Sequence, residues 1–168
     1  MRIVQTFWTG NNELLEYSFG WLHPEYNLMS WALSCLCLRT HYKDVVLYTD
    51  SKGYHILIDV LKLPYSEVHV VYDNFKCLSH HWALAKLMTY YSQKEKFLHI
   101  DGDIYLVKPL PKRILNASLI AQNRKIGSRY YQSMIDNILK QKTISVPAFI
   151  KESIEDTSLC SYNTGFFG

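Results

Sequence analysis

The feature that most constrains this sequence is residues 96–111, KFLHIDGDIYLVKPLP, where an apolar run ends in two aspartates. The run predicts a buried strand. If the segment stays extended, Asp101 and Asp103 point to the same side, and Gly102 between them leaves room for a close ligand. Two carboxylates aimed together repel unless a cation lies between them, and oxygen ligands suit Mg²⁺ or Mn²⁺. The stretch predicts a metal site, with a polar turn after a strand as the alternative.

The residues that follow the two aspartates favour the metal site over the turn. An apolar run resumes at residues 104–107 and stops at Pro109 and Pro111. The carboxylates are therefore expected inside buried structure, where a charge without a purpose would be costly.

Strands and helices are expected to alternate along the chain. Apolar runs predict strands at 2–8, 44–49, 67–72, 96–100 and 118–122, with a loop and strand over 159–168. Helical patterns are expected at 24–41, 80–92, 131–139 and 147–154, and after the polar cluster 50–53 through residue 61. This alternation predicts an α/β fold with a mostly parallel sheet and helices on both faces, as in Rossmann-like proteins. In such sheets ligands bind at the carboxyl ends of the strands, where residues 9–12, Asp50, Asp73 and residues 101–103 are collected. The helix at 24–41 is apolar over so much of its surface that both flanks are expected to be packed.

Length and composition limit the classes of protein that fit. The 168 residues suit a single domain over 1–168, and the net charge of +3 does not indicate nucleic-acid binding. No signal peptide and no apolar run long enough to span a bilayer is evident. The four cysteines form no CxxC pair, so we expect free thiols and a cytoplasmic protein, with work at a membrane surface left open. The chain also lacks the glycine motifs of dinucleotide oxidoreductases and P-loop NTPases.

Three ordered motifs carry a family resemblance. They are the helix HHWALAKLMTYY, the acidic stretch FLHIDGDIYLVKPLP and the final SYNTGFFG. Together they resemble the nucleotide-sugar-binding half of a GT-A glycosyltransferase, of the bacterial polysaccharide or glycogenin-like type. The resemblance implies an enzyme that transfers a sugar from a nucleotide diphosphate, a UDP-sugar being favoured, to a hydroxyl of a glycan or other acceptor. In that family the acceptor half follows the Asn-x-Gly strand, so we expect this chain to be truncated at its C-terminus.

The resemblance also implies roles for charged residues. Asp101 and Asp103 correspond to the DxD motif that holds Mn²⁺ or Mg²⁺, with Asp103 the direct ligand and Asp101 shared with the donor's ribose or sugar. Lys86 corresponds to a basic residue that meets the donor's sugar or phosphates. The alternative for Lys86 is a lysine on a solvated helix stripe.

Polar residues near the two ends of the chain are further donor-binding candidates. Asn163, Thr164 and Gly165 match the Asn-x-Gly strand beside the donor sugar, with a turn entering a buried strand as the alternative. Thr9, Asn11 and Asp50 are nucleotide candidates that could instead make local turns and caps. No catalytic residue is assigned.

Two other functions stay open beside the glycosyltransferase. A nucleotidyltransferase that makes nucleotide sugars usually carries a glycine-rich basic loop after its first strand. Residues 9–12 of this chain contain one glycine and no basic residue. A non-catalytic relative that only binds a nucleotide sugar would share every motif above.

Overall fold

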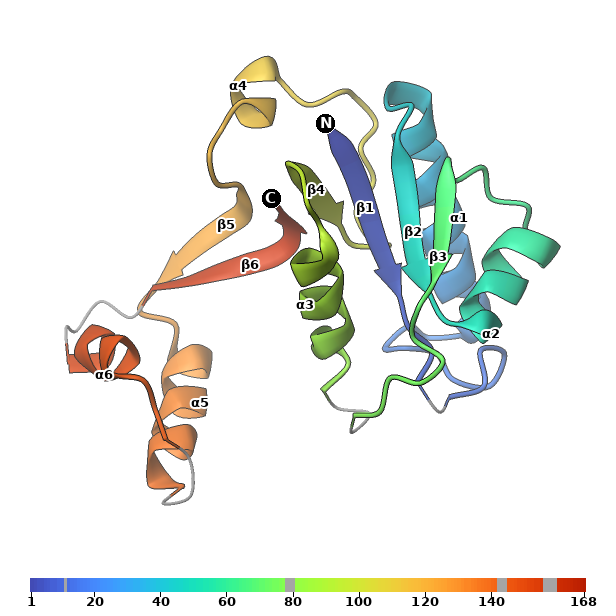
Figure 1. Cartoon of the computed structure of the whole chain (residues 1–168). Helices are drawn as coiled ribbons and strands as arrows, with labels where there is room; N and C mark the ends of the chain where they lie inside the picture. Colours follow the sequence, from blue (N-terminus) through green and yellow to red (C-terminus); the bar gives the residue numbers. More distant parts are fainter. Residues whose placement is uncertain (11, 78–80, 142–144, 156–159) are drawn as a thin grey trace. The chain divides into compact units, whose positions relative to one another are not determined.

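The chain folds into strands and helices that alternate through most of its length (Figure 1), and the computed structural model describes residues 1–10, 12–77, 81–141, 145–155 and 160–168. The strands are β1 (Arg2–Phe7), β2 (Val45–Thr49), β3 (Glu67–Val70), β4 (Phe97–Ile100), β5 (Ala121–Ile126) and β6 (Cys160–Phe167). The helices are α1 (Pro24–His41), α2 (Ser51–Tyr54), α3 (Ala83–Ser92), α4 (Lys112–Leu115), α5 (Arg129–Lys140) and α6 (Ala148–Glu155), and a π-helical segment, η1 (His55–Val60), continues α2. The strand expected at 118–122 begins later, at Ala121.

Two compact units make up the chain. The first comprises Met1–Ile120 and Gly165–Gly168, and the second comprises Ala121–Thr164. The second unit contains β5, α5, α6 and most of β6, and in it the Arg124 side chain donates to Cys160 Sγ at 2.9 Å. The expectation of one domain over 1–168 stays a prediction beside this division.

The sheet has six strands in the order β3-β2-β1-β4-β6-β5. Strands β2 and β4 pair parallel with β1, and β3 pairs parallel with β2, whereas β6 pairs antiparallel with β4. The fold is therefore α/β with a mixed sheet, and the prediction of a mostly parallel sheet is wrong. A helical crossover makes the next strand parallel, but the composition of a strand does not specify its direction, so the sequence pattern did not reveal that β6 runs antiparallel to β4.

Helices α1 and α3 cover opposite faces of the parallel strands (Figure 1). Phe7 of β1 packs with Trp31 of α1, whereas Val4 packs with Ala85 of α3. Successive side chains of a strand point to opposite faces, so β1 contributes to both cores. Every residue of β2 is buried, as expected for a strand that is covered on both sides.

Helix α1 follows the sequence-based boundaries. Pro24 occupies its first turn, where a missing N–H costs nothing, and Glu25 complements the helix dipole there. The expectation that both flanks are packed is wrong, because Met29, Leu33 and Leu36 are exposed. No helix in the described part of the chain is long and apolar enough to cross a bilayer.

A buried glutamine links β1 to three neighbouring segments. Gln5 is fully buried, and its Nε2 donates to Ser34 Oγ at 3.0 Å and to the Ile100 carbonyl at 3.2 Å. Its Oε1 accepts from the Tyr65 hydroxyl at 2.7 Å. Buried polar groups with all partners in place stabilise one arrangement of the elements, because any shift would leave several of them unpaired.

Replacement of Gln5 by alanine should therefore destabilise the protein. The Tyr65 hydroxyl and the Ile100 carbonyl would lose their partner, and a cavity would remain, so we expect the free energy of unfolding to fall by about 2–3 kcal/mol. Urea denaturation followed by circular dichroism measures this loss. Gln132→Ala, at a half-buried residue of α5 whose side chain makes an exposed hydrogen bond to Asp136, is the control and should change it by less than about 0.5 kcal/mol. Equal stability of both variants would contradict the assigned role of Gln5.

Candidate functional site

A pocket of about 420 Å³ lies in the first unit, at the carboxyl ends of β1 and β4. Its volume is typical of small-molecule sites. Strands β2 and β3 follow on one side of β1, whereas β4 lies on its other side, so the strand order reverses between β1 and β4. This is the point at which open α/β sheets bind ligands. The residues that line the pocket after these strands include Trp8, Thr9, Asp101, Gly102 and Asp103.

Aromatic side chains form much of the pocket lining. All four tryptophans of the chain, Trp8, Trp21, Trp31 and Trp82, contribute to it. Pockets of this kind combine aromatic surface with a few polar groups that orient the ligand. The intrinsic fluorescence of the protein therefore reports on the occupancy of this pocket.

The polar centre of the pocket is an ion pair between Lys86 of α3 and Asp101. The Lys86 Nζ atom lies 2.8 Å from Asp101 Oδ1 and donates to Oδ2 at 2.9 Å. Lys86 is only 8% exposed and also lies over the Trp82 ring, 5.7 Å from its centroid. The interpretation of Lys86 as a lysine on a solvated stripe is therefore wrong.

Burial shifts the pKa values of Asp101 and of the neighbouring His99. Burial raises the pKa of Asp101, the Lys86 ammonium opposes this rise, and the Asp103 carboxylate adds to it. Burial and, secondarily, the Lys86 charge hold the pKa of His99 well below its ordinary value. His99 is therefore neutral at pH 7, and the 3.6 Å distance between its Nδ1 and Asp101 Oδ1 marks neither an ion pair nor a hydrogen bond.

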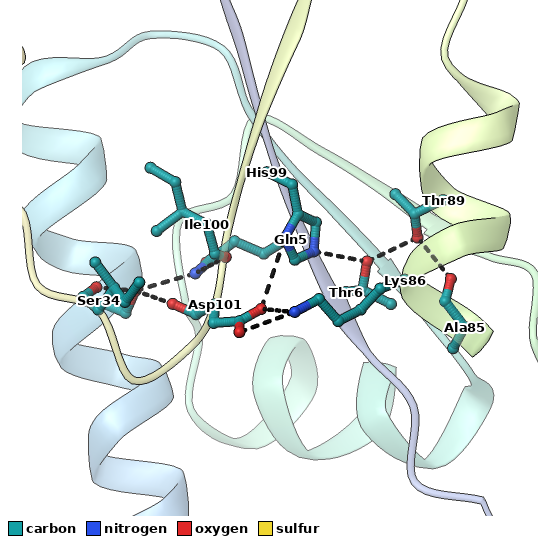
Figure 2. A network of polar contacts seen from close by, with 10 residues as sticks. Gln5, Thr6, Ser34, Ala85, Lys86, Thr89, His99, Ile100 and Asp101 are labelled. Carbon is teal, nitrogen blue, oxygen red and sulfur yellow. Dashed lines mark hydrogen bonds and ion pairs between the residues drawn. The ribbon is translucent and has the colours of Figure 1, made fainter. Parts of the chain in front are cut away.

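A row of hydroxyl groups continues from His99 towards α3 (Figure 2). His99 Nε2 lies 3.0 Å from Thr6 Oγ1, which lies 2.7 Å from Thr89 Oγ1. Thr89 in turn donates to the Ala85 carbonyl and contacts the Tyr72 hydroxyl. The imidazole ring of His99, next to Asp101, is thus held in place by Thr6 of β1 together with Thr89 of α3.

The acidic stretch is a turn and not an extended segment. Strand β4 ends at Ile100, and the Ile104 amide donates to the Asp101 carbonyl at 3.1 Å. Asp101 is partly buried and Asp103 is exposed, so the expectation that both carboxylates lie inside buried structure is wrong for Asp103. Both residues nevertheless line the pocket.

Two serines of α1 hold the backbone of this turn. Ser30 Oγ donates to the Gly102 carbonyl at 2.8 Å, and Ser34 Oγ donates to the Ile104 carbonyl at 2.8 Å. Ser30 Oγ also lies 2.7 Å from the Tyr105 hydroxyl. Because these carbonyls are bound from the α1 side, the turn presents its two carboxylates to the pocket in a defined position.

Gly102 makes room for a tryptophan and not for a ligand. A Cβ atom on Gly102 would lie 2.3 Å from Cε2 of Trp31, a distance that non-bonded atoms do not reach. The expectation that the missing side chain leaves space for a ligand is corrected accordingly. The close approach of Trp31 is what gives the pocket its wall at this point.

Thr9 and Asp50 lie at the same edge of the sheet and bind one another. Asp50 Oδ2 accepts from the Thr9 amide at 2.8 Å and from its hydroxyl at 2.6 Å, and Oδ1 accepts from the Gly53 amide at 2.8 Å as the cap of α2. Asp73 similarly accepts from the amide and hydroxyl of Ser51, which lowers its pKa. Thr9 lines the pocket, so its role in binding a nucleotide stays a prediction, as does that of Asp50.

Three of the remaining donor-binding candidates belong to the chain's last strand, and the fourth, Asn11, is not among the described residues. The Gly165 carbonyl accepts from the Asp101 amide at 2.8 Å, which places this glycine beside the acidic turn. Asn163 and Thr164 belong to β6 within the second unit, and their roles stay predictions. Asn11 lies outside the described residues.

The donor atoms fit a divalent ion only in part. Both oxygens of Asp101 already accept from Lys86, and Asp103 is the exposed carboxylate beside it. Within the described ranges, no group of three or more His, Cys, Asp or Glu side chains is placed to hold a metal. Mg²⁺ is usually bound by one or two carboxylates together with phosphate oxygens of the substrate. Asp101 and Asp103 therefore fit an ion whose shell a diphosphate completes.

Three pocket residues of α1 were missed by sequence reasoning. Asn27, Ser30 and Trp31 line the pocket from one side of this helix. The available signal was the group of polar residues Asn27, Ser30 and Ser34, which recur at helical spacing within an otherwise apolar helix. Polar positions on the buried side of a helix indicate a site that binds either backbone or ligand.

The chain belongs to the DUF6734 family, a family of unknown function, which it matches over residues 1–168. No curated protein and no solved structure matches the chain.

Replacement of Gly102 by alanine should disturb the pocket. The added Cβ atom would collide with Trp31, so we expect the ring or the turn to move and the free energy of unfolding to fall by about 1–3 kcal/mol. Tryptophan fluorescence and urea denaturation measure both effects. Trp31→Phe is the control: its smaller ring should reduce the cost of Gly102→Ala in the double variant. Additive losses in the double variant would show that the two residues do not interact.

Proposed function

We propose that the chain binds a nucleotide sugar, with a UDP-sugar as the first candidate, and is the donor-binding part of a metal-dependent glycosyltransferase. The observation that carries the proposal is the position of the pocket, which opens where the strand order reverses and is lined by Lys86, Asp101 and Asp103. A nucleotide fits at such a point with its phosphates near the ends of the central strands. The finer assignment of the fold as GT-A-like is part of the same proposal and is supported by the parallel order β3-β2-β1-β4.

The charges around the acidic turn suit a diphosphate. Lys86 brings one positive charge, which the Asp101 carboxylate balances, and Asp103 adds a negative charge at the pocket surface. A diphosphate would therefore be repelled unless a cation came with it. Asp103 would bind Mn²⁺ or Mg²⁺ directly, with Asp101 beside it, and the bound ion would neutralise charge on the leaving diphosphate.

The proposed reaction is a group transfer. The bond between the anomeric carbon of the sugar and the diphosphate oxygen breaks, and the electron pair leaves with the nucleoside diphosphate. The acceptor hydroxyl oxygen bonds to the anomeric carbon and gives up its proton to a base or to water. Lys86 is proposed to stabilise the charge that develops on the departing diphosphate, because it is a fixed cation in a site of low exposure.

The proposal also includes the kind of acceptor and the cellular compartment. We take the acceptor to be a hydroxyl of a glycan or other molecule, as in polysaccharide biosynthesis. All four cysteines are free thiols, which supports a cytoplasmic setting, with peripheral contact to a membrane as a further element of the proposal.

Binding of UDP should depend on a divalent ion. The diphosphate and the carboxylates of Asp101 and Asp103 repel one another, so we expect UDP to bind at least about tenfold more tightly with Mn²⁺ than with EDTA. Because Asp101 is already paired with Lys86, Mn²⁺ without UDP should bind weakly. Isothermal titration calorimetry measures the affinities of both ligands separately and together.

The matched variant for this experiment is Asp103→Asn. It removes a charge that raises the pKa of Asp101, so the unfolding midpoint should stay equal or rise slightly, while the advantage of Mn²⁺ over EDTA is lost. Equal affinity for UDP with Mn²⁺ and with EDTA in the unmodified protein would refute the metal site.

Replacement of Lys86 by methionine should weaken UDP binding strongly. The variant keeps most of the aliphatic stem but loses the cation, and we expect a loss of about 2 kcal/mol in UDP affinity with Mn²⁺. It should also lower stability, because Asp101 stays partly buried without its partner. The double variant with Asp101→Asn should regain stability but not affinity. A UDP affinity within about twofold of the original in Lys86→Met would remove Lys86 from the site.

A further inference from the structure

Asn27 is a buried polar side chain whose amide nitrogen has no hydrogen-bond partner in the fold. It lies in the first part of α1, is only 4% exposed and lines the pocket. Its Nδ2 atom is buried and has no hydrogen-bond partner. Among the described residues that line the pocket, no other side chain has a buried nitrogen or oxygen atom left in this state. Buried donors are almost always paired, so the pocket's ligand or an ordered water is expected to complete this one.

The position of Asn27 relates it to the acidic turn. Ser30 and Trp31 are its neighbours three and four residues on, so the three side chains lie on one side of the helix. Ser30 binds the Gly102 carbonyl, and the Trp31 ring lies against Gly102. Asn27 is therefore one helical turn away from residues that contact the turn carrying Asp101 and Asp103.

The chemistry of the amide selects a kind of ligand. A carboxamide donates through nitrogen and accepts through oxygen, which matches a hydroxyl group that does both. It carries no charge, so it has no preference for a phosphate, which Lys86 serves better. The four tryptophans add aromatic surface that suits the apolar face of a sugar ring. The pocket thus combines charged residues suited to a diphosphate with an amide and aromatic rings suited to a neutral, hydroxyl-rich group.

We propose that Asn27 is a specificity-determining residue that hydrogen-bonds the hydroxyl groups of the donor's sugar. This inference rests on the proposed function, since it assumes that a nucleotide sugar occupies the pocket. The unpaired Nδ2 atom of Asn27 then lowers the stability of the empty protein, and in return it lets the pocket distinguish a nucleotide sugar from the bare nucleotide.

The test compares UDP with UDP-glucose, UDP-galactose and UDP-N-acetylglucosamine, each with Mn²⁺, by tryptophan fluorescence. In the unmodified protein at least one UDP-sugar should bind at least about threefold more tightly than UDP, as expected for one or two hydrogen bonds. We call the affinity for this UDP-sugar divided by the affinity for UDP the sugar ratio. Asn27→Leu, of similar size but apolar, should reduce this ratio to about one, while the affinity for UDP stays within about twofold. Its unfolding midpoint should equal or exceed that of the unmodified protein, because no buried donor is left unpaired.

Two further variants make the result decisive. Asn12→Ala also changes an amide that lines the pocket, but this amide donates to the Thr9 carbonyl at 3.1 Å, so the ratio should persist. Asn27→Ala removes both the donor and the acceptor without adding a charge to the pocket, and it should abolish the preference for the UDP-sugar even if Asn27→Leu does not fold.

The outcomes separate the inference from the proposed function. A ratio that persists in both Asn27 variants, or an unmodified protein that binds every UDP-sugar no better than UDP, overturns the role of Asn27 while the nucleotide site stands. An unmodified protein that binds none of these ligands overturns the proposed function and this inference together.

Discussion

The ion pair between Lys86 and Asp101 is the interaction on which the site depends. It joins α3 to the end of β4, and because Lys86 is only 8% exposed, solvent screens the pair less than it would screen a pair at the surface. The backbone on both sides of Asp101 is held from the other face of the sheet, because Gln5 binds the Ile100 carbonyl and Ser34 binds the Ile104 carbonyl. The acidic turn is therefore fixed by both helix layers at once.

This arrangement explains how one pocket can serve groups of different chemistry. The turn after β4 supplies charge through Asp101 and Asp103, and α1 supplies the neutral amide of Asn27 and the ring of Trp31. Both sets of residues reach the pocket because the strand order reverses between β1 and β4, which leaves space between the segments that follow these strands. Neither set depends on the second unit, Ala121–Thr164.

Sequence patterns located most of the strands and helices and the acidic stretch, but neither the turn that this stretch forms nor what the turn contacts. The boundaries of α1 follow from Pro24 and from continuous helical periodicity, which are local signals. The role of Gly102 could not be predicted, because it depends on which face of α1 brings Trp31 against the turn. For the same reason the sequence left Lys86 open as a donor-binding residue or as a lysine on a solvated stripe, and Asn27 was missed altogether. Contacts between elements distant in the sequence decide each of these cases.

The central claim is that the pocket at the ends of β1 and β4 holds a nucleotide diphosphate and a divalent ion together. Crystals grown with UDP and Mn²⁺ test it most directly, since anomalous scattering locates the manganese. The account predicts a manganese peak at about 2.0–2.3 Å from an Asp103 carboxylate oxygen and from oxygens of the diphosphate, with Lys86 beside the phosphates. Manganese or UDP bound elsewhere on the protein, with this pocket empty, would contradict it.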